Sequence, residues 1–350
     1  MTTRRILLKS AATVFALSLA TPTLAQSDEP VPVVATFSIL GDMVGRIGGE
    51  HVEVTTLVGP DGDAHVYQPT PADARAVSSA EVLFVNGLEF EGWIDRLVDA
   101  SDFNGTRVVA TQGIEPIAFE EGDEHHDDDG HDDHDDHADH DDHDDHADHD
   151  DHADHDDHDD HDDHAESGHD DHHHGAFDPH AWQSLAAGEI YAMNIAQALA
   201  QADPDNAQDY QANAEAYVAE MQSLDAEILA LVDALPADAR TVVTSHDAFG
   251  YFADRYGLVF EAPQGLSTES EPSAADVAEL ITQIRDEEIS AVFVESITDN
   301  RLLEQIASET NATVGGTLYS DALSGSDGPA STYLDMMRHN ATTLAQALGS

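Results

Sequence analysis

The chain of 350 residues contains no cysteine. This absence excludes disulfide bonds, a thiolate metal site and a lipid carried by an N-terminal cysteine, so any metal must be held by His, Asp, Glu or water. Basic residues are also scarce, with 12 Lys and Arg against 72 Asp and Glu and a formal net charge of −60. Such a charge repels nucleic acid and anionic membranes and attracts cations. The composition predicts metal ions as partners and no binding to nucleic acid.

Long apolar runs are missing after the N-terminal segment, so we expect no insertion into a membrane. Residues 1–25 have the pattern of a cleaved signal peptide: basic Arg4 and Arg5, an apolar run over Ala11–Ala20, and small residues at Thr23–Ala25. The paired arginines leave two routes open, general secretion and twin-arginine export. The pattern predicts a soluble protein in a Gram-negative periplasm.

Residues 120–175 consist almost entirely of Asp and His, and 18 of the 23 histidines of the chain lie there. A histidine stands at every third position from His131 to His164, a period that fits neither helix nor strand. Without apolar side chains the segment cannot offset the entropy cost of ordering, which predicts a long disordered loop. A solubilising acidic linker is the alternative to a loop with many weak metal sites. The candidate weak ligands are His131, His134, His137, His140, His143, His146, His149, His152, His155, His158, His161, His164, His172, His173 and His174.

Outside this loop, short apolar or β-branched runs alternate with helix-like stretches. This alternation predicts an α/β fold of two lobes, each with a mostly parallel sheet flanked by helices. The expected strands are Val33–Phe37, Val52–Val58, Glu81–Val85, Arg107–Ala110, Thr241–Thr244, Val259–Ala262, Ala291–Glu295 and Thr313–Tyr319. The expected helices are Asp42–Ile47, Pro71–Ser79, Trp93–Ala100, Phe249–Tyr256, Ala274–Asp286, Arg301–Thr310 and Tyr333–Leu348, with a capping box at Ser273 and Asp276.

Between the two halves, apolar residues recur at intervals of three and four. The stripe comprises Tyr210, Ala214, Tyr217, Met221, Leu224, Ile228 and Leu231. It predicts one long helix that runs along both lobes, with a coiled-coil dimer seam as the alternative. The expected organisation is a first lobe over 26–205 that includes the His/Asp-rich loop, a linking helix over 206–235 and a second lobe over 236–350.

Four candidate ligands stand just after strand-like segments: His65, His180, His246 and Asp321. In open α/β sheets, ligands bind beyond the carboxyl ends of the strands, so the four can converge between the lobes. Taken singly, each residue also has a structural explanation, because such histidines are often surface residues and an Asp there is often a helix cap.

Around these four residues the chain resembles the metal-binding proteins of zinc and manganese ABC importers, of the ZnuA and TroA kind. The resemblance runs from about Val33 to the C-terminus. It rests on four stretches: Asp-Ala-His-Val-Tyr-Gln-Pro-Thr-Pro (63–71), Asp-Pro-His-Ala-Trp (178–182), Ser-His-Asp-Ala-Phe-Gly-Tyr-Phe (245–252) and Leu-Tyr-Ser-Asp-Ala-Leu (318–323). The resemblance implies two four-stranded α/β lobes joined by one rigid helix. It also implies metal ligands at His65, His180, His246 and Asp321, and no enzymatic activity.

The residue type at position 246, the third ligand in chain order, helps to indicate which metal is bound. Manganese carriers of this family tend to have a carboxylate where this chain has His246, and three imidazoles with one carboxylate suit Zn²⁺ better. Some zinc-binding relatives carry a glutamate ligand where this chain has Ala64, so Asp321 or water is expected as the fourth ligand. A manganese or iron carrier and a periplasmic zinc buffer or store remain alternatives. A zinc hydrolase is disfavoured because four protein ligands leave no position for an activated water.

The resemblance also implies partners. We expect delivery of Zn²⁺ to an ABC transporter permease by a monomeric carrier, with a periplasmic zinc chaperone as a further candidate partner. The tethered loop is expected to collect, sense or buffer zinc near the crevice.

Overall fold

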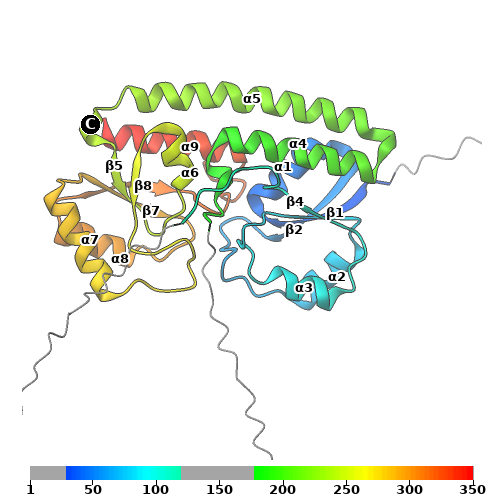
Figure 1. Cartoon of the computed structure of the whole chain (residues 1–350), viewed down its shortest axis with the longest axis horizontal. Coiled ribbons are helices and arrows are strands. Elements are labelled where there is room, and N and C mark those ends of the chain that lie inside the picture. The colour runs from blue at the N-terminus through cyan, green and yellow to red at the C-terminus, as the bar shows by residue number, and fades with distance from the viewer. Residues whose placement is uncertain (1–28, 120–176, 350) are drawn as a thin grey trace, which may run out of the picture.

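The structure, a computed structural model, describes residues 29–119 and 177–349. Within these ranges the chain forms two α/β lobes that lie side by side along the long axis of the molecule (Figure 1). The signal peptide expected over 1–25 and the His/Asp-rich loop expected over 120–175, with all of its candidate histidines, lie outside the described residues.

The first lobe is built on a parallel sheet with the strand order β2-β1-β3-β4. Its central strands are apolar on both faces because helices cover both sides of the sheet. All four residues of β3, for example, are buried. The strands are β1 (Val31–Phe37), β2 (Val52–Val58), β3 (Val82–Val85) and β4 (Thr106–Val109); the helices are α1 (Ser38–Gly48), α2 (Pro71–Ser79), α3 (Ile94–Ser101) and α4 (Leu185–Ala202).

The second lobe repeats this arrangement, with four parallel strands in the order β6-β5-β7-β8. The two equivalent sheets and their helices confirm the predicted fold class. The strands are β5 (Thr241–Val243), β6 (Val259–Glu261), β7 (Ala291–Glu295) and β8 (Thr313–Leu318); the helices are α6 (Gly250–Tyr256), α7 (Ala274–Asp286), α8 (Arg301–Glu309) and α9 (Tyr333–Leu348).

Side-chain caps fix where two of these helices begin. The predicted capping box of α7 is present. The hydroxyl of Ser273 accepts a hydrogen bond from the backbone N–H of Asp276, and the backbone N–H of Ser273 donates one to the carboxylate of Asp276. Thr70 and Asp73 form a second box at the start of α2, with Pro71 at the first helical position. Starting α2 at residue 71 leaves the preceding residues 59–70 as a loop, and this loop carries His65.

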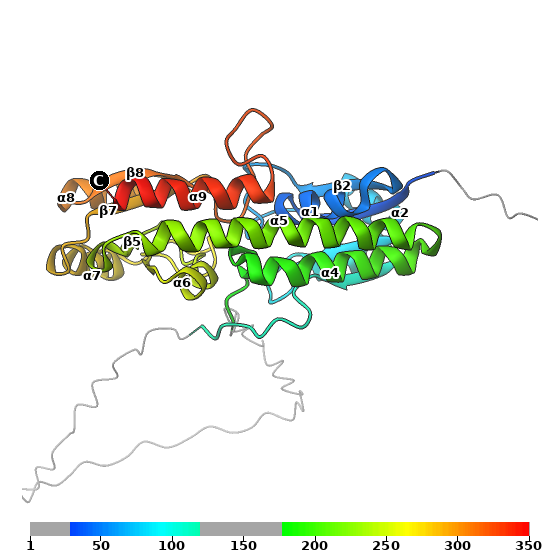
Figure 2. The same cartoon turned by 90° about the horizontal axis from the view of Figure 1, so that it is seen from above.

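The long helix α5 (Ala207–Asp233) lies along both lobes (Figure 1). Seen from above, it runs between α4 and α9, one helix from each lobe (Figure 2). The apolar stripe is buried as predicted except at its end, where Val232 is buried and Leu231 is 39% exposed. A straight α-helix drifts from a strict three-four repeat, so the buried face advances by one residue after about six turns. No helix of the described residues is both long and apolar enough to span a bilayer.

Candidate metal centre

Four side chains converge between the lobes: His65, His180, His246 and Asp321. His65 follows β2, His246 follows β5, Asp321 follows β8, and His180 directly precedes a short 3₁₀ helix, η2 (Ala181–Gln183). Each offers one nitrogen or oxygen atom, and these atoms all lie within 4.8 Å of one another. Three of the four thus lie beyond the carboxyl ends of strands, where α/β sheets bind their ligands. The prediction for His180 is wrong, because no strand of the described residues directly precedes it.

The carboxylate of Asp321 lies among three imidazole nitrogens. Its Oδ2 is 3.1 Å from Nε2 of His65 and 3.2 Å from Nε2 of His246, and its Oδ1 is 3.6 Å from Nε2 of His180. His180, His246 and Asp321 have no exposed surface, and His65 is 6% exposed. The cluster is therefore shielded from solvent.

The atoms that face one another in the cluster lack hydrogen-bond partners. Nε2 of all three histidines and both carboxylate oxygens of Asp321 are buried without a hydrogen bond. Burying a polar atom without a partner costs about 1–3 kcal/mol, so five such atoms at one point need compensation. A divalent cation supplies it, because it accepts lone pairs from imidazole and carboxylate together. This donor set fits a nitrogen-rich, four-coordinate metal site.

The outer nitrogens of two histidines face buried carboxylates. Nδ1 of His180 hydrogen bonds to Oδ1 of Asp178 over 2.7 Å, and Nδ1 of His246 lies 2.6 Å from Oε2 of Glu295. With a carboxylate on Nδ1, each ring keeps its Nε2 lone pair for the cluster, the usual arrangement around metal-binding histidines. The other carboxylate oxygen of Glu295, Oε1, accepts hydrogen bonds from the backbone N–H groups of Ser245 and His246, at 2.7 and 2.9 Å.

The sequence identified only part of this supporting set. Position alone makes Asp247 and Glu295 candidate partners of a clustered histidine, and the structure places Glu295 against His246. Asp178 lies two residues before His180, a spacing that could have identified it as the second partner.

Charge interactions dominate the titration of this cluster. Burial opposes the charged imidazolium, yet the carboxylates of Glu295 and Asp321 raise the pKa of His246 well above its ordinary value. Burial also opposes the ionised form of Asp321, but the imidazoles of His246 and His180 hold its pKa well below the ordinary range. Metal binding requires the neutral imidazole, so the raised pKa of His246 makes the affinity of this site for a metal depend on pH.

Contacts between the lobes hold the Asp321 loop in place. Trp182 Nε1 and Gln183 Nε2, both from η2, donate to the backbone carbonyl of Ser320 over 2.8 and 2.7 Å. The hydroxyl of Tyr333, in the second lobe, donates back to the carbonyl of Trp182 over 2.6 Å. The first lobe thereby positions Asp321, the carboxylate that the second lobe contributes to the cluster.

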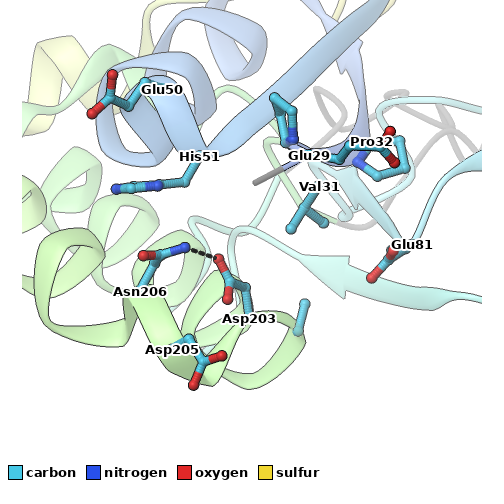
Figure 3. A pocket seen from close by; sticks show the side chains of 11 residues that line it. Glu29, Val31, Pro32, Glu50, His51, Glu81, Asp203, Asp205 and Asn206 are labelled. Atoms are coloured by element: carbon cyan, nitrogen blue, oxygen red, sulfur yellow. Dashed lines mark hydrogen bonds between the residues drawn. The ribbon is translucent and has the colours of Figure 1, made fainter. Parts of the chain in front are cut away.

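A cavity of about 660 Å³ opens elsewhere, at the amino ends of the strands of the first lobe (Figure 3). One of its acidic groups, Asp203, accepts hydrogen bonds from Asn206 and Tyr210 at 2.7 Å. None of the four clustered residues lines it. The candidate metal centre is thus defined by its buried donor atoms and not by this hollow. The side chains labelled around the cavity in Figure 3 are Glu29, Val31, Pro32, Glu50, His51, Glu81, Asp203, Asp205 and Asn206.

Comparisons with known proteins identify the family of the chain. Residues 33–347 match the family described as ZnuA, "Zinc-uptake complex component A periplasmic". The manganese-binding lipoprotein MntA of Halalkalibacterium halodurans is 29% identical over 324 residues, which cover 92% of this chain and 90% of that protein. The iron-binding protein YfeA of Yersinia pestis is 30% identical over 317 residues, covering 91% and 86%.

Solved structures show the same architecture. The manganese-bound periplasmic metal-binding protein of Candidatus Liberibacter asiaticus is similar with a TM-score of 0.70 and 30% identity, covering 91% of this chain and all of that one. The periplasmic zinc-binding protein TroA of Treponema pallidum gives a TM-score of 0.73 with 25% identity, covering 91% and 99%. The chain therefore belongs to the ZnuA family and is a substrate-binding component of a metal ABC transporter.

Proposed function

We propose that this protein captures Zn²⁺ at the centre formed by His65, His180, His246 and Asp321 and delivers it to the permease of an ABC importer. The observation that carries the proposal is the set of three imidazole nitrogens and one carboxylate with unpartnered, buried lone pairs. Their number and type match the tetrahedral sites in which proteins hold zinc. The cation is the cargo of the carrier and takes part in no reaction.

The names of the relatives specify different metals, namely manganese, iron and zinc. The choice of zinc here rests on His246. Imidazole is a borderline ligand that suits Zn²⁺, whereas Mn²⁺ prefers carboxylate, carbonyl and water oxygens. Glu295 supports the same choice, because its carboxylate on Nδ1 makes the ring a better donor through Nε2.

Exchanging the third ligand tests the proposed metal. A glutamate at position 246 alone would face the carboxylate of Glu295, so the informative variant is H246E combined with E295Q, with E295Q alone as the matched control. We expect the double variant to bind Zn²⁺ at least about tenfold more weakly than E295Q and to gain affinity for Mn²⁺. The measurement is competition for each metal against a chromogenic chelator. A double variant that keeps the zinc preference of E295Q would contradict the role given to His246.

The cellular setting is part of the proposal. We propose export through the signal peptide of residues 1–25, action in the periplasm as a monomer, and delivery to a membrane permease. A periplasmic zinc chaperone is a candidate donor. MntA is named a lipoprotein, whereas the 350 residues here include no cysteine to carry such a lipid.

The His/Asp-rich segment over 120–175 is proposed as an accessory element that collects zinc close to the crevice. It joins the first lobe after residue 119 and returns at residue 177, directly before Asp178 and His180. Tethering at this point keeps any ion it holds at high local concentration near the metal centre.

A further inference from the structure

One carboxylate oxygen of Asp178 contacts both the backbone and the ring of the clustered residue His180. This oxygen, Oδ1, accepts the backbone N–H of His180 over 2.8 Å and lies 2.7 Å from Nδ1 of its imidazole. Asp178 is 3% exposed, and His180 has no exposed surface. Because both contacts end on one oxygen, a rotation of this carboxylate disturbs the backbone and the ring of His180 together. The orientation of His180 therefore depends on what fixes the carboxylate of Asp178.

The other oxygen of this carboxylate, Oδ2, lies against Gly250 of the second lobe. Gly250 is the first residue of α6, which contacts η2 beside the metal centre (Figure 2). A methyl group at Gly250 would lie 2.4 Å from Oδ2 and 3.6 Å from Cγ of Asp178, whereas atoms do not approach a Cβ closer than about 3.0 Å. The carboxylate of Asp178 thus occupies the space that a side chain at position 250 would fill.

The backbone at Gly250 does not itself require glycine. Gly250 is a helical residue, a conformation that all L-residues adopt, and glycine in a helix is less favourable than alanine by up to about 1 kcal/mol. Gly257, directly after α6, differs because its φ of 77° lies in the left-handed region. Local structure therefore favours alanine at position 250, and the contact with Asp178 opposes it.

The next residue of α6, Tyr251, contacts the backbone of Asp178. The hydroxyl of Tyr251 donates to the carbonyl of Asp178 over 3.3 Å and accepts the backbone N–H of Ile117 over 3.2 Å. The N–H of Asp178 in turn donates to the carbonyl of Ile117 over 2.9 Å. Two successive residues of the second lobe therefore contact the residue of the first lobe that orients His180.

We propose that the second lobe orients His180 through Asp178, with Gly250 and Tyr251 as positioning residues of the metal centre. Gly250 leaves the space in which the carboxylate meets His180, and Tyr251 fixes the backbone that carries this carboxylate. The carboxylate is planar and rigid, so pushing Oδ2 away from position 250 also moves Oδ1 off His180. The inference rests on the proposed function and adds the residues that align one of its ligands from the opposite lobe.

Adding a methyl group at position 250 tests this role. We expect Gly250→Ala to weaken Zn²⁺ binding at least about tenfold, because loss of the carboxylate behind a ligand histidine costs about 10- to 100-fold in metal affinity. Asp178→Ala should cause a loss within that range. In the double variant the methyl group meets no carboxylate, so its affinity should equal that of Asp178→Ala within about twofold. Gly45→Ala is the matched control, since a methyl group on this residue of α1 would lie 4.0 Å from Val54.

The measurement is competition for Zn²⁺ between each full-length variant and a chromogenic chelator, with circular dichroism to check folding. A loss from Gly250→Ala that adds in full to that of Asp178→Ala would overturn the proposal, because a merely structural disturbance of α6 acts with or without the carboxylate. Equal zinc affinities of Gly250→Ala and Gly45→Ala would overturn it as well.

A conservative change at Tyr251 tests the same claim and decides it if Gly250→Ala does not fold. We expect Tyr251→Phe to weaken Zn²⁺ binding about fivefold, the weight of one hydrogen bond. Tyr256→Phe is the matched control, because it removes a hydroxyl of the same helix that donates to Asp225. Equal zinc affinities of the two phenylalanine variants would contradict the proposal. Absence of tight zinc binding in the unchanged protein would instead overturn the proposed function itself.

Discussion

Replacing His246 with alanine is expected to weaken zinc binding at the metal centre by more than about 100-fold. Binding of zinc to four protein ligands is worth about 10–16 kcal/mol, so one ligand accounts for about 3 kcal/mol. The loss also leaves Glu295 buried without the charge that it faces. Competition against a chelator of known affinity measures the change, and alanine at His65 or His180 should have effects of the same order.

His51→Ala is the matched control for this experiment. His51 lies at the cavity of the first lobe, where its Nε2 is 3.1 Å from Asp209 and where no clustered ligand is present. Its removal should leave tight zinc binding unchanged. A storage protein with many equivalent sites would retain its affinity in both variants, and that outcome would refute a single transport site.

Zinc affinity is expected to fall steeply as pH falls through the neutral range. The folded, metal-free protein has the pKa of His246 raised above its ordinary value by Glu295 and Asp321, against the effect of burial. The raised pKa moves protonation of this imidazole to higher pH, and only its neutral form binds metal. Each ion bound must release this proton, so the affinity should drop about tenfold per pH unit below the raised pKa, about 100-fold over two units.

Two measurements check this dependence. Calorimetry in buffers of different ionisation enthalpy should detect a proton released from His246 on zinc binding at neutral pH. In E295Q the anion that raises the pKa of His246 is gone, so less proton should be released and the dependence on pH should flatten. An affinity of the unchanged protein that stays constant from pH 8 to 6 would show that His246 is already neutral.

Much of the fold could be predicted because its strands are short runs rich in apolar or β-branched residues and are separated by clear helix starts. Val52–Val58 and Ala291–Glu295 were located to the residue, since polar or turn residues flank each β-branched run. Helix α7 was bounded by the capping box at Ser273. The residues within and next to each of these elements determine where it begins and ends, so the elements can be located from a single sequence.

Helix α4 was not predicted, and its composition explains why. The eighteen residues of Leu185–Ala202 are rich in alanine, and both alanines and large side chains such as Tyr191 and Ile195 are buried. The contrast between an apolar and a polar face is correspondingly weak, so no stripe is visible. Tertiary packing against α5 and the first sheet stabilises this helix, and that packing cannot be read from a local pattern.

The four clustered residues were predictable from motifs, whereas their supporting groups mostly were not. Glu295 accepts a hydrogen bond from the backbone N–H of His246, 49 residues away in the sequence. The hydroxyl of Thr268 donates a hydrogen bond to the carboxylate of Asp63, 205 residues away. Such pairs are created by strand order and by the approach of the two lobes. A sequence shows which side chains are able to bind a metal, but the fold decides which carboxylate turns each imidazole toward it.

The most direct test of the central claim is a competition titration of the metal-free protein with Zn²⁺ and Mn²⁺, in the full chain and in a chain lacking residues 122–175. We expect one tight site in both chains that prefers Zn²⁺, with additional weaker sites only in the full chain. Preference of the tight site for Mn²⁺, or loss of tight zinc binding on deletion of the segment, would contradict it.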